Sequence, residues 1–197
     1  SVLATSPTIA TVANASSAAG TYPITVTGGS AANYQLSYQN GTLAVGEGAQ
    51  VIHFVSELNA TYGQAALTLE GNATSGLSLG YSSSNPAVAE VNGSKLLILG
   101  AGTSVITASQ GGNANFDAAP DRNATLQVGK ATMTVKANDA SKAYLAAVPS
   151  LSYELLGFVN DENASVLATS PTIATVANAS SAAGTYPITV TGGSAAN

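Results

Sequence analysis

The sequence predicts an all-β protein built from tandem β-sandwich domains, and three observations lead to this prediction. Short segments alternate apolar and polar residues, as half-buried strands do. Gly, Pro and Asn interrupt these segments about every 8 to 12 residues, a spacing typical of β-sandwiches. Residues 1–33 recur letter for letter as residues 165–197, at an offset of 164 residues. No long segment has helical periodicity.

The clearest strand pattern lies near the N-terminus. The apolar side chains Tyr22, Ile24 and Val26 alternate with polar ones, so they share one face of a strand. Two further segments show the same alternation and are rich in β-branched residues: Thr132–Lys136 and Ser104–Ala108.

Two Asn-Gly pairs stand between such segments and predict β-hairpins. Asn40-Gly41 would join residues 34–39 to 42–45, and Asn92-Gly93 would join residues 88–91 to 95–99. An Asn-Gly pair favours a type I′ turn because both central residues of that turn need positive φ.

The recurrence of 33 residues indicates a longer array of near-identical 164-residue units, the alternative being an artificial duplication. Units in such arrays contact mainly their neighbours. The period is much longer than one short solenoid repeat. We therefore expect two small domains in each period.

The composition excludes several classes of function. Charged residues make up 8% of the chain, against about 25% in typical proteins. The net charge of −5 and the scattered basic residues argue against nucleic acid as a partner. The absence of cysteine excludes disulfides, thiolate metal sites and a cysteine nucleophile. No apolar run in this segment reaches the ~18 residues of a membrane span.

Five segments carry a resemblance to a known family: Ala131–Asp139, Leu151–Val159, Ala164–Thr169, Gly184–Gly192 and Ala196-Asn197. They resemble the first part of the MBG module, a mostly-β, glycine-rich unit of large bacterial and archaeal surface adhesins. Residues 33–45 match its closing hairpin. The sequence departs from the family pattern at Tyr144-Leu145, where the module usually has Tyr-Gly, so the tight turn at that position is in question.

The middle of the chain resembles a bacterial Ig-like (Big) adhesin domain in Tyr62-Gly63, Ser75-Gly76, Tyr81–Val88, Leu99–Ser109 and Gly112–Pro120. The two resemblances imply three segments. Residues 1–48 would be the C-terminal part of an MBG-like module, and residues 49–130 a bacterial Ig-like domain. Residues 131–197 would be the N-terminal part of the next MBG-like module.

This division cuts each MBG-like module in two, so both pieces would present unpaired strand edges. We hypothesise that the pieces complete one another along a filament. Completion would come from a continuous chain or from strand donation between subunits. Pairing of residues 131–164 with residues 1–48 of the same chain is the other possibility.

Acceptor sites for N-linked glycans are unusually frequent. Eight of the 14 Asn residues that have a second following residue stand in Asn-X-Ser/Thr, where about three are expected from the Ser and Thr content. A glycan coat would hydrate a surface that has few charges. We expect N-glycans, and no cofactor, at these residues: Asn14, Asn40, Asn59, Asn72, Asn92, Asn123, Asn163 and Asn178.

The other chemically capable residues are weaker candidates. His53 is the only histidine and lies in a strand pattern, where we expect it on the outer face without catalytic partners. Asp161-Glu162 is a possible calcium loop but fits a solvated turn better. Lys136 and Asn138 are too close in sequence for a useful isopeptide cross-link. Exposed aromatic residues could form a sugar-binding platform, although packing is the commoner role: Tyr22, Tyr34 and Tyr38.

Together, these observations predict an extracellular structural repeat without enzymatic activity, which forms a cell-surface stalk or filament. The partners would be neighbouring copies of the chain. The alternative is an adhesin binding module for a cell-surface, matrix or carbohydrate ligand, which would carry an apolar or aromatic patch of several hundred Å². Repetition favours the stalk, because a ligand-binding tip is usually unique.

Overall fold

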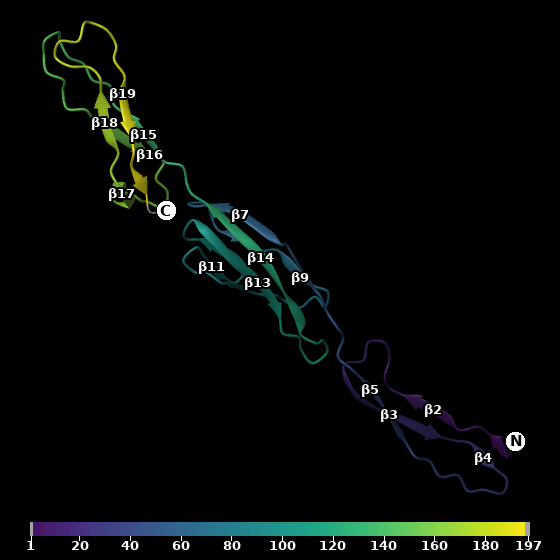
Figure 1. Ribbon diagram of the computed structural model, residues 1–197. Helices are drawn as coiled ribbons and strands as arrows, with labels where there is room; N and C mark the ends of the chain where they lie inside the picture. Colours follow the sequence, from purple (N-terminus) through teal and green to yellow (C-terminus); the bar gives the residue numbers. More distant parts are fainter. Residues whose placement is uncertain (1, 196–197) are drawn as a thin grey trace. The chain divides into compact units, whose positions relative to one another are not determined.

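The computed structural model describes residues 2–195, which form twenty β-strands and one short 3-10 helix, and it confirms the all-β prediction (Figure 1). Ser1, Ala196 and Asn197, which belong to the repeated segment, lie outside the described residues. No helix within residues 2–195 has the length and apolar character needed to cross a membrane.

The backbone contacts divide the chain into two compact units, and both take residues from the middle of the sequence. Unit 1 comprises Ser1–Val55, Glu70–Tyr81 and Thr107–Asn123, and unit 2 comprises Ser56–Leu69, Ser82–Ile106 and Ala124–Asn197. The division into segments 1–48, 49–130 and 131–197 stays a prediction.

The N-terminal part of unit 1 forms two small antiparallel sheets. The first has the order β2-β3-β5, with β2 at Thr8–Thr11, β3 at Gly20–Thr27 and β5 at Gly41–Val45. The second pairs β1 (Leu3–Thr5) with β4 (Ser30–Ala31). Residues directly opposite one another share a face of a sheet. The register of Ile9 with Val26, and of Tyr22 with Leu43, therefore gathers apolar side chains on one face of the first sheet.

The prediction of a hairpin at Asn40-Gly41 is wrong. Residues 34–39 form no strand, and β5 pairs with β3 instead, from Gly20 opposite Val45 to Ile24 opposite Gly41. Asn40 accepts a hydrogen bond from the backbone N–H of Val26 through its side-chain Oδ1, at 3.4 Å. β5 forms five residue pairs with the open edge of β3. It therefore pairs with this more distant strand and not with the neighbouring residues 34–39.

The rest of unit 1 holds a small core. β6 (Ile52–Phe54) pairs with β9 (Gly71–Ala73). Ile52, Ala108 and Ala119 are buried together, and Phe54, Leu79 and Tyr81 pack against them. The rings of Phe54 and Tyr81 lie 5.5 Å apart between centroids, and burial raises the pKa of Tyr81 above its ordinary value.

Two further sheets use the middle of the chain. One has the order β10-β13-β14-β7, with β10 at Gly80–Ser83, β13 at Gly102–Gln110, β14 at Ala119–Gly129 and β7 at Glu57–Thr61. Its pair β14 and β7 runs parallel, from Thr125 opposite Glu57 to Gly129 opposite Thr61. The other has the order β11-β12-β8, with β11 at Ala89–Asn92, β12 at Lys95–Ile98 and β8 at Leu67–Thr68.

The second predicted hairpin is confirmed, but the type I′ turn predicted with Asn92 and Gly93 as central residues is wrong. β11 and β12 are antiparallel, with Asn92 opposite Lys95, so Gly93 and Ser94 form the two-residue turn. Gly93 has a φ of 61°, as the first central residue of a type II′ turn requires. Three large side chains of these two sheets are fully buried: Leu96 on β12, Ile106 on β13 and Leu126 on β14. Each stabilises the fold by about 1.5 to 3 kcal/mol relative to exposure.

The C-terminal part of unit 2 consists of three strand pairs and the helix η1 (Ala164–Val166). The pairs are β15 (Thr134–Ala137) with β16 (Tyr153–Leu156), β17 (Leu167–Thr169) with β20 (Ser194–Ala195), and β18 (Thr172–Thr175) with β19 (Ile188–Thr191). β15 lies near β19. Within each terminal part, the described strands therefore pair with strands of the same part.

Candidate functional sites: acceptor asparagines, junctions and a groove

All eight asparagines of the Asn-X-Ser/Thr sites are exposed. Four lie in loops: Asn14, Asn40, Asn163 and Asn178. The other four lie on strands and point outward: Asn59 on β7, Asn72 on β9, Asn92 on β11 and Asn123 on β14. Occupation by glycans at these residues stays a prediction, but none of the eight is closed off by packing.

Five of these side chains accept hydrogen bonds through Oδ1: Asn14, Asn40, Asn123, Asn163 and Asn178. At Asn14, the donors are the backbone N–H and the hydroxyl of Ser16, at 2.9 and 2.7 Å. Within residues 2–195, Nδ2 of none of the five donates to a protein acceptor. Nδ2 is the atom to which an N-linked glycan is attached, so these contacts hold the side chain and leave the attachment atom available.

A junction in unit 2 joins residues 100 positions apart. The hydroxyl of Tyr62, a buried residue, donates to Oε1 of Glu162 at 2.8 Å. Beside it, Gly63 has a φ of 84°, and a Cβ at this position would lie 2.5 Å from Cβ of Val159. Only glycine allows the two segments to approach so closely. We call this contact of Tyr62 and Gly63 with Val159 and Glu162 the Tyr62 junction.

A second junction, in unit 1, centres on Asn115. Its side-chain Oδ1 accepts a hydrogen bond from the backbone N–H of Ala19 at 2.9 Å. Its backbone carbonyl accepts from the N–H of Gly48 at 2.8 Å, and the carbonyl of Gly48 accepts from the N–H of Asp117 at 3.0 Å. We call this set of contacts the Asn115 junction. One loop thus holds residues from two places in the N-terminal segment.

No pattern in the sequence predicted which residues meet at either junction. Asn115 lies in a segment that resembles an Ig-like domain, but no pattern links it to residues 19 and 48. Glu162 was expected in a solvated turn, and the structure shows it half-buried with Tyr62 as its partner. The Tyr62-Gly63 pair was the only signal that could have pointed to a close approach of two segments.

The other candidate residues form no reactive site. His53 is exposed on β6, as predicted. Within residues 2–195, no three His, Cys, Asp or Glu side chains come together to hold a metal ion. The amide of Asn138 donates to the hydroxyl of Ser152 at 3.0 Å rather than meeting Lys136. The hydroxyl of Tyr22 donates to the carbonyl of Ala18 at 2.8 Å.

Exposed aromatic and apolar side chains occur at Tyr34, at Tyr38 and at the adjacent pair Tyr144 and Leu145. Tyr34 is 66% exposed, and Tyr38, also exposed, donates its hydroxyl to the carbonyl of Gly28. Tyr144 and Leu145 are adjacent and both exposed. Leu145 has a φ of 67°, the left-handed conformation that favours glycine. The tight turn at Tyr144-Leu145, which the sequence left in question, therefore forms, and Leu145 adopts the backbone conformation usually taken by glycine.

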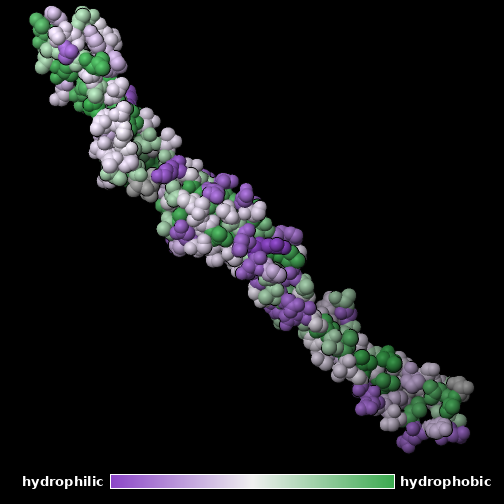
Figure 2. Space-filling model, in the orientation of Figure 1, coloured by the Kyte–Doolittle hydropathy of each residue, from purple (hydrophilic) through white to green (hydrophobic). Residues whose placement is uncertain are grey.

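The two copies of the repeated segment have different surroundings. In the first copy, the apolar face of the β2-β3-β5 sheet is open, and Ile9 is 68% exposed (Figure 2). In the second copy, the equivalent Ile173 is half-buried. Residues 131–164 contact the second copy: β15 lies near β19, and the N–H of Leu145 donates to the carbonyl of Ala179 at 3.0 Å.

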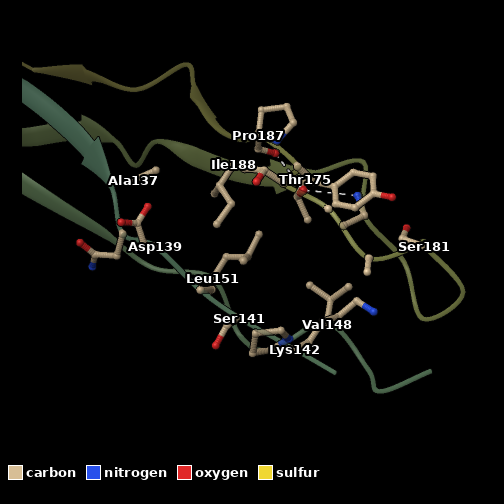
Figure 3. A pocket seen from close by; sticks show the side chains of 18 of the residues that line it. Ala137, Asp139, Ser141, Lys142, Val148, Leu151, Thr175, Ser181, Pro187 and Ile188 are labelled. Atoms are coloured by element: carbon tan, nitrogen blue, oxygen red, sulfur yellow. Dashed lines mark hydrogen bonds between the residues drawn. The ribbon is translucent and has the colours of Figure 1, made fainter. Parts of the chain in front are cut away.

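A groove lies between residues 137–151 and the second copy of the repeated segment. Its volume is about 670 Å³, and Figure 3 shows its two walls facing one another. One wall comes from residues 137–151, including Leu151 and Val148. The other comes from residues 175–188, including Tyr186 and Ile188. We call this the 184–188 groove, after the segment that forms its edge.

The fold and these sites define a class: an all-β protein that repeats a 33-residue segment, has junctions that depend on a glycine and on an asparagine, and exposes many Asn-X-Ser/Thr sequences. Residues 2–44 and 133–197 match the family model for the MBG domain (YGX type). The matched residues make up more than half of the chain, so the chain belongs to this family. The resemblance of residues 50–130 to a bacterial Ig-like domain stays a prediction.

Among solved structures, the chain is similar to domains 1–6 of the surface layer protein SbsC, with 13% sequence identity and a TM-score of 0.29. The match covers 88% of this chain and 25% of that chain, so this chain spans about a quarter of the other protein's resolved length. A likeness this low carries no argument about function. No curated protein matches the chain.

Proposed function

We propose that the chain is a repeating structural unit of an extracellular stalk or filament at a cell surface. The observation that carries this proposal is the unchanged recurrence of residues 1–33 as 165–197 in a chain of the MBG family. Repetition without change suits an element whose role depends on length, because each added unit extends the reach of the stalk. It does not suit a catalytic site, which needs to occur only once.

The junctions fit this role. A stalk stays extended only if consecutive segments are held against one another and cannot bend freely. The Tyr62 junction combines a hydrogen bond to a carboxylate with a glycine that allows close packing. The Asn115 junction uses backbone hydrogen bonds at Gly48 and Asp117. Each restricts bending within its unit without requiring a large apolar interface.

We further propose N-linked glycans on the acceptor asparagines. All eight are exposed, and the chain has only 8% charged residues to keep its surface hydrated. Glycans on strand positions such as Asn59, Asn72 and Asn123 would also cover sheet edges and faces. Such cover would limit lateral aggregation and protease access.

The test uses native cells and two readouts. An antibody against the chain should bind intact cells, and mild protease treatment should remove that binding. Glycopeptide mapping should find glycans at the Asn-X-Ser/Thr sites, while the exposed Asn113 and Asn115, which are not in such sites, should be bare. Antibody binding only after lysis would contradict the surface location. Eight bare acceptor sites would contradict the glycan coat.

A second candidate is an adhesive module. The adjacent exposed side chains Tyr144 and Leu145, together with the groove, favour it as a place where a cell-surface or carbohydrate ligand could bind. Binding of the chain to a glycan array, lost in Tyr144→Ala and kept in Tyr34→Ala, would favour this candidate. Absence of binding to glycans and to cell surfaces would favour the stalk.

A further inference from the structure

The same sequence adopts two different strand lengths in the two copies of the repeated segment. β3 runs over eight residues, Gly20–Thr27, whereas β19 covers only Ile188–Thr191, the equivalents of residues 24–27. The equivalents of Gly20 to Pro23, residues 184–187, belong to no strand. Local propensity cannot cause this difference because the residues are identical. The difference must therefore come from the strand with which each copy pairs.

The partner in the first copy is β5. It pairs with residues 20–24, which include the four that lose strand structure in the second copy. On its other edge, β3 pairs with β2 in the same register as β19 pairs with β18: Ile9 opposite Val26, and Ile173 opposite Val190. Each copy therefore has the inner strand pair, but only the first copy has the third strand.

We propose that residues 184–188 bind a strand with the sequence of Gly41–Val45, supplied by a second copy of the repeat, in the register seen for β3. Val45 would stand opposite Gly184, and Gly41 opposite Ile188. The chain's own β5 is engaged by β3, so the strand must be an additional one. This inference rests on the proposed function and names how one repeat contacts the next.

The backbone of the second copy suits this pairing. In the first copy, the N–H of Val26 points toward Asn40, at the start of β5. N–H groups alternate sides along a strand, so those of Ile24 and Tyr22 point to the same edge. Their equivalents are Ile188 and Tyr186. Pro187 lacks an N–H, but its position would point to the opposite edge, so the proline leaves no gap in the new ladder.

The side chains of the second copy also suit pairing with a strand of this sequence. In the first copy, Leu43 of β5 lies directly opposite Tyr22, so the two share a sheet face. In the second copy, the equivalent Tyr186 lines the groove. Figure 3 shows Leu151 and Val148 on the wall that faces Ile188. A strand bound in this register would bring the leucine beside Tyr186, at the edge of a groove that Val148, Leu151 and Ile188 also line.

The experiment extends the full chain after Asn197 by a second copy of residues 34–46. Amide hydrogen exchange, followed by NMR, should show that the N–H groups of Tyr186 and Ile188 exchange at least ten-fold more slowly in the extended chain than in the original. The thermal midpoint of unfolding should also rise. NMR is needed because proteolytic peptides from the two identical segments have equal masses.

Matched extensions test the register. Leu43→Pro, made in the added copy only, removes the N–H that would pair with Tyr186, and it should return exchange at Tyr186 to that of the unextended chain. Ala44→Pro in the added copy removes an N–H that points away, and protection should remain. A free peptide of residues 33–46 should shift the same amide signals when added to the unextended chain.

Unchanged exchange at Tyr186 and Ile188 in the extended chain, with Tyr22 and Ile24 still protected, would overturn the inference. So would equal protection with the two proline extensions. These outcomes do not depend on cell location, so they are distinct from a failure of the proposed function. If surface filaments are found and the amide of Tyr186 is not protected from exchange, only the strand pairing is contradicted. If that amide is protected and no label is found at the cell surface, only the stalk is contradicted.

Discussion

The hydroxyl of Tyr62 and the carboxylate of Glu162 form a hydrogen bond at 2.8 Å across 100 residues of sequence. Tyr62 follows β7, and Glu162 lies in the turn before η1. The contact therefore joins the middle of the chain to its C-terminal part within unit 2. Because Val159 packs on Gly63 beside it, the junction combines one directional bond with close apolar packing.

Removing the hydroxyl tests the directional part of the Tyr62 junction. Tyr62→Phe keeps the ring and deletes the hydrogen bond, so the free energy of unfolding should fall by about 1.5 to 3 kcal/mol, as for a bond to a charged acceptor. The measurement is denaturant unfolding. Tyr34→Phe, at a tyrosine that is 66% exposed, is the control and should change stability little. Equal effects of the two substitutions would contradict the role given to Tyr62.

Adding a methyl group tests the packing part. Gly63→Ala introduces a Cβ 2.5 Å from Val159 in a backbone with φ of 84°. Gly76→Ala is a matched control, because Gly76 has φ of 78° and nothing within 4 Å of a built Cβ. The backbone strain, about 1 to 2 kcal/mol, is common to both. The clash should add about 1 to 3 kcal/mol at Gly63 alone. Thermal unfolding of the two variants would show whether that difference exists.

Leu145 offers a substitution that should stabilise the protein. Its φ of 67° costs a leucine about 1 to 2 kcal/mol relative to a right-handed conformation, and its side chain is 67% exposed, so little burial is lost on replacement. Leu145→Gly should raise the free energy of unfolding by up to about 1 kcal/mol, after the entropy cost of glycine. Leu145→Asn should act in the same direction. Leu145→Val should destabilise, and a stabilising valine would refute the strain.

The Asn115 junction can be opened at its side chain alone. Asn115→Ala deletes the acceptor for the N–H of Ala19 and leaves the backbone bond to Gly48 in place. We expect a loss of about 0.5 to 1.5 kcal/mol and faster limited proteolysis near residue 19. Asn115→Asp keeps an oxygen acceptor and should behave like the original chain. If aspartate is as damaging as alanine, the hydrogen bond is not what holds the segment.

Local patterns in the sequence predicted the strands well. Tyr22, Ile24 and Val26 lie on one face of β3, and His53 lies on the outer face of β6, because period-two alternation directly encodes which side of a strand is buried. The Asn92-Gly93 hairpin also formed, since its two strands are adjacent in sequence and have no better partners.

Pairing between distant segments could not be predicted in the same way. Asn40-Gly41 carries the same turn signal as Asn92-Gly93, yet β5 pairs with β3, about twenty residues earlier. The contact of Tyr62 with Glu162 depends on how whole segments pack, and single residues carry no signal for it. The resemblance of the sequence to the MBG family predicted the membership that the family model shows.

The proposed function requires the chain to be one unit of a repetitive surface filament. Cryo-electron tomography of native cells, labelled with antibody fragments against residues 50–130, tests this most directly. We predict thin filaments that project from the surface and carry the label at regular intervals, one for each 164-residue unit. Label confined to isolated compact particles, or to the cell interior, would contradict the account.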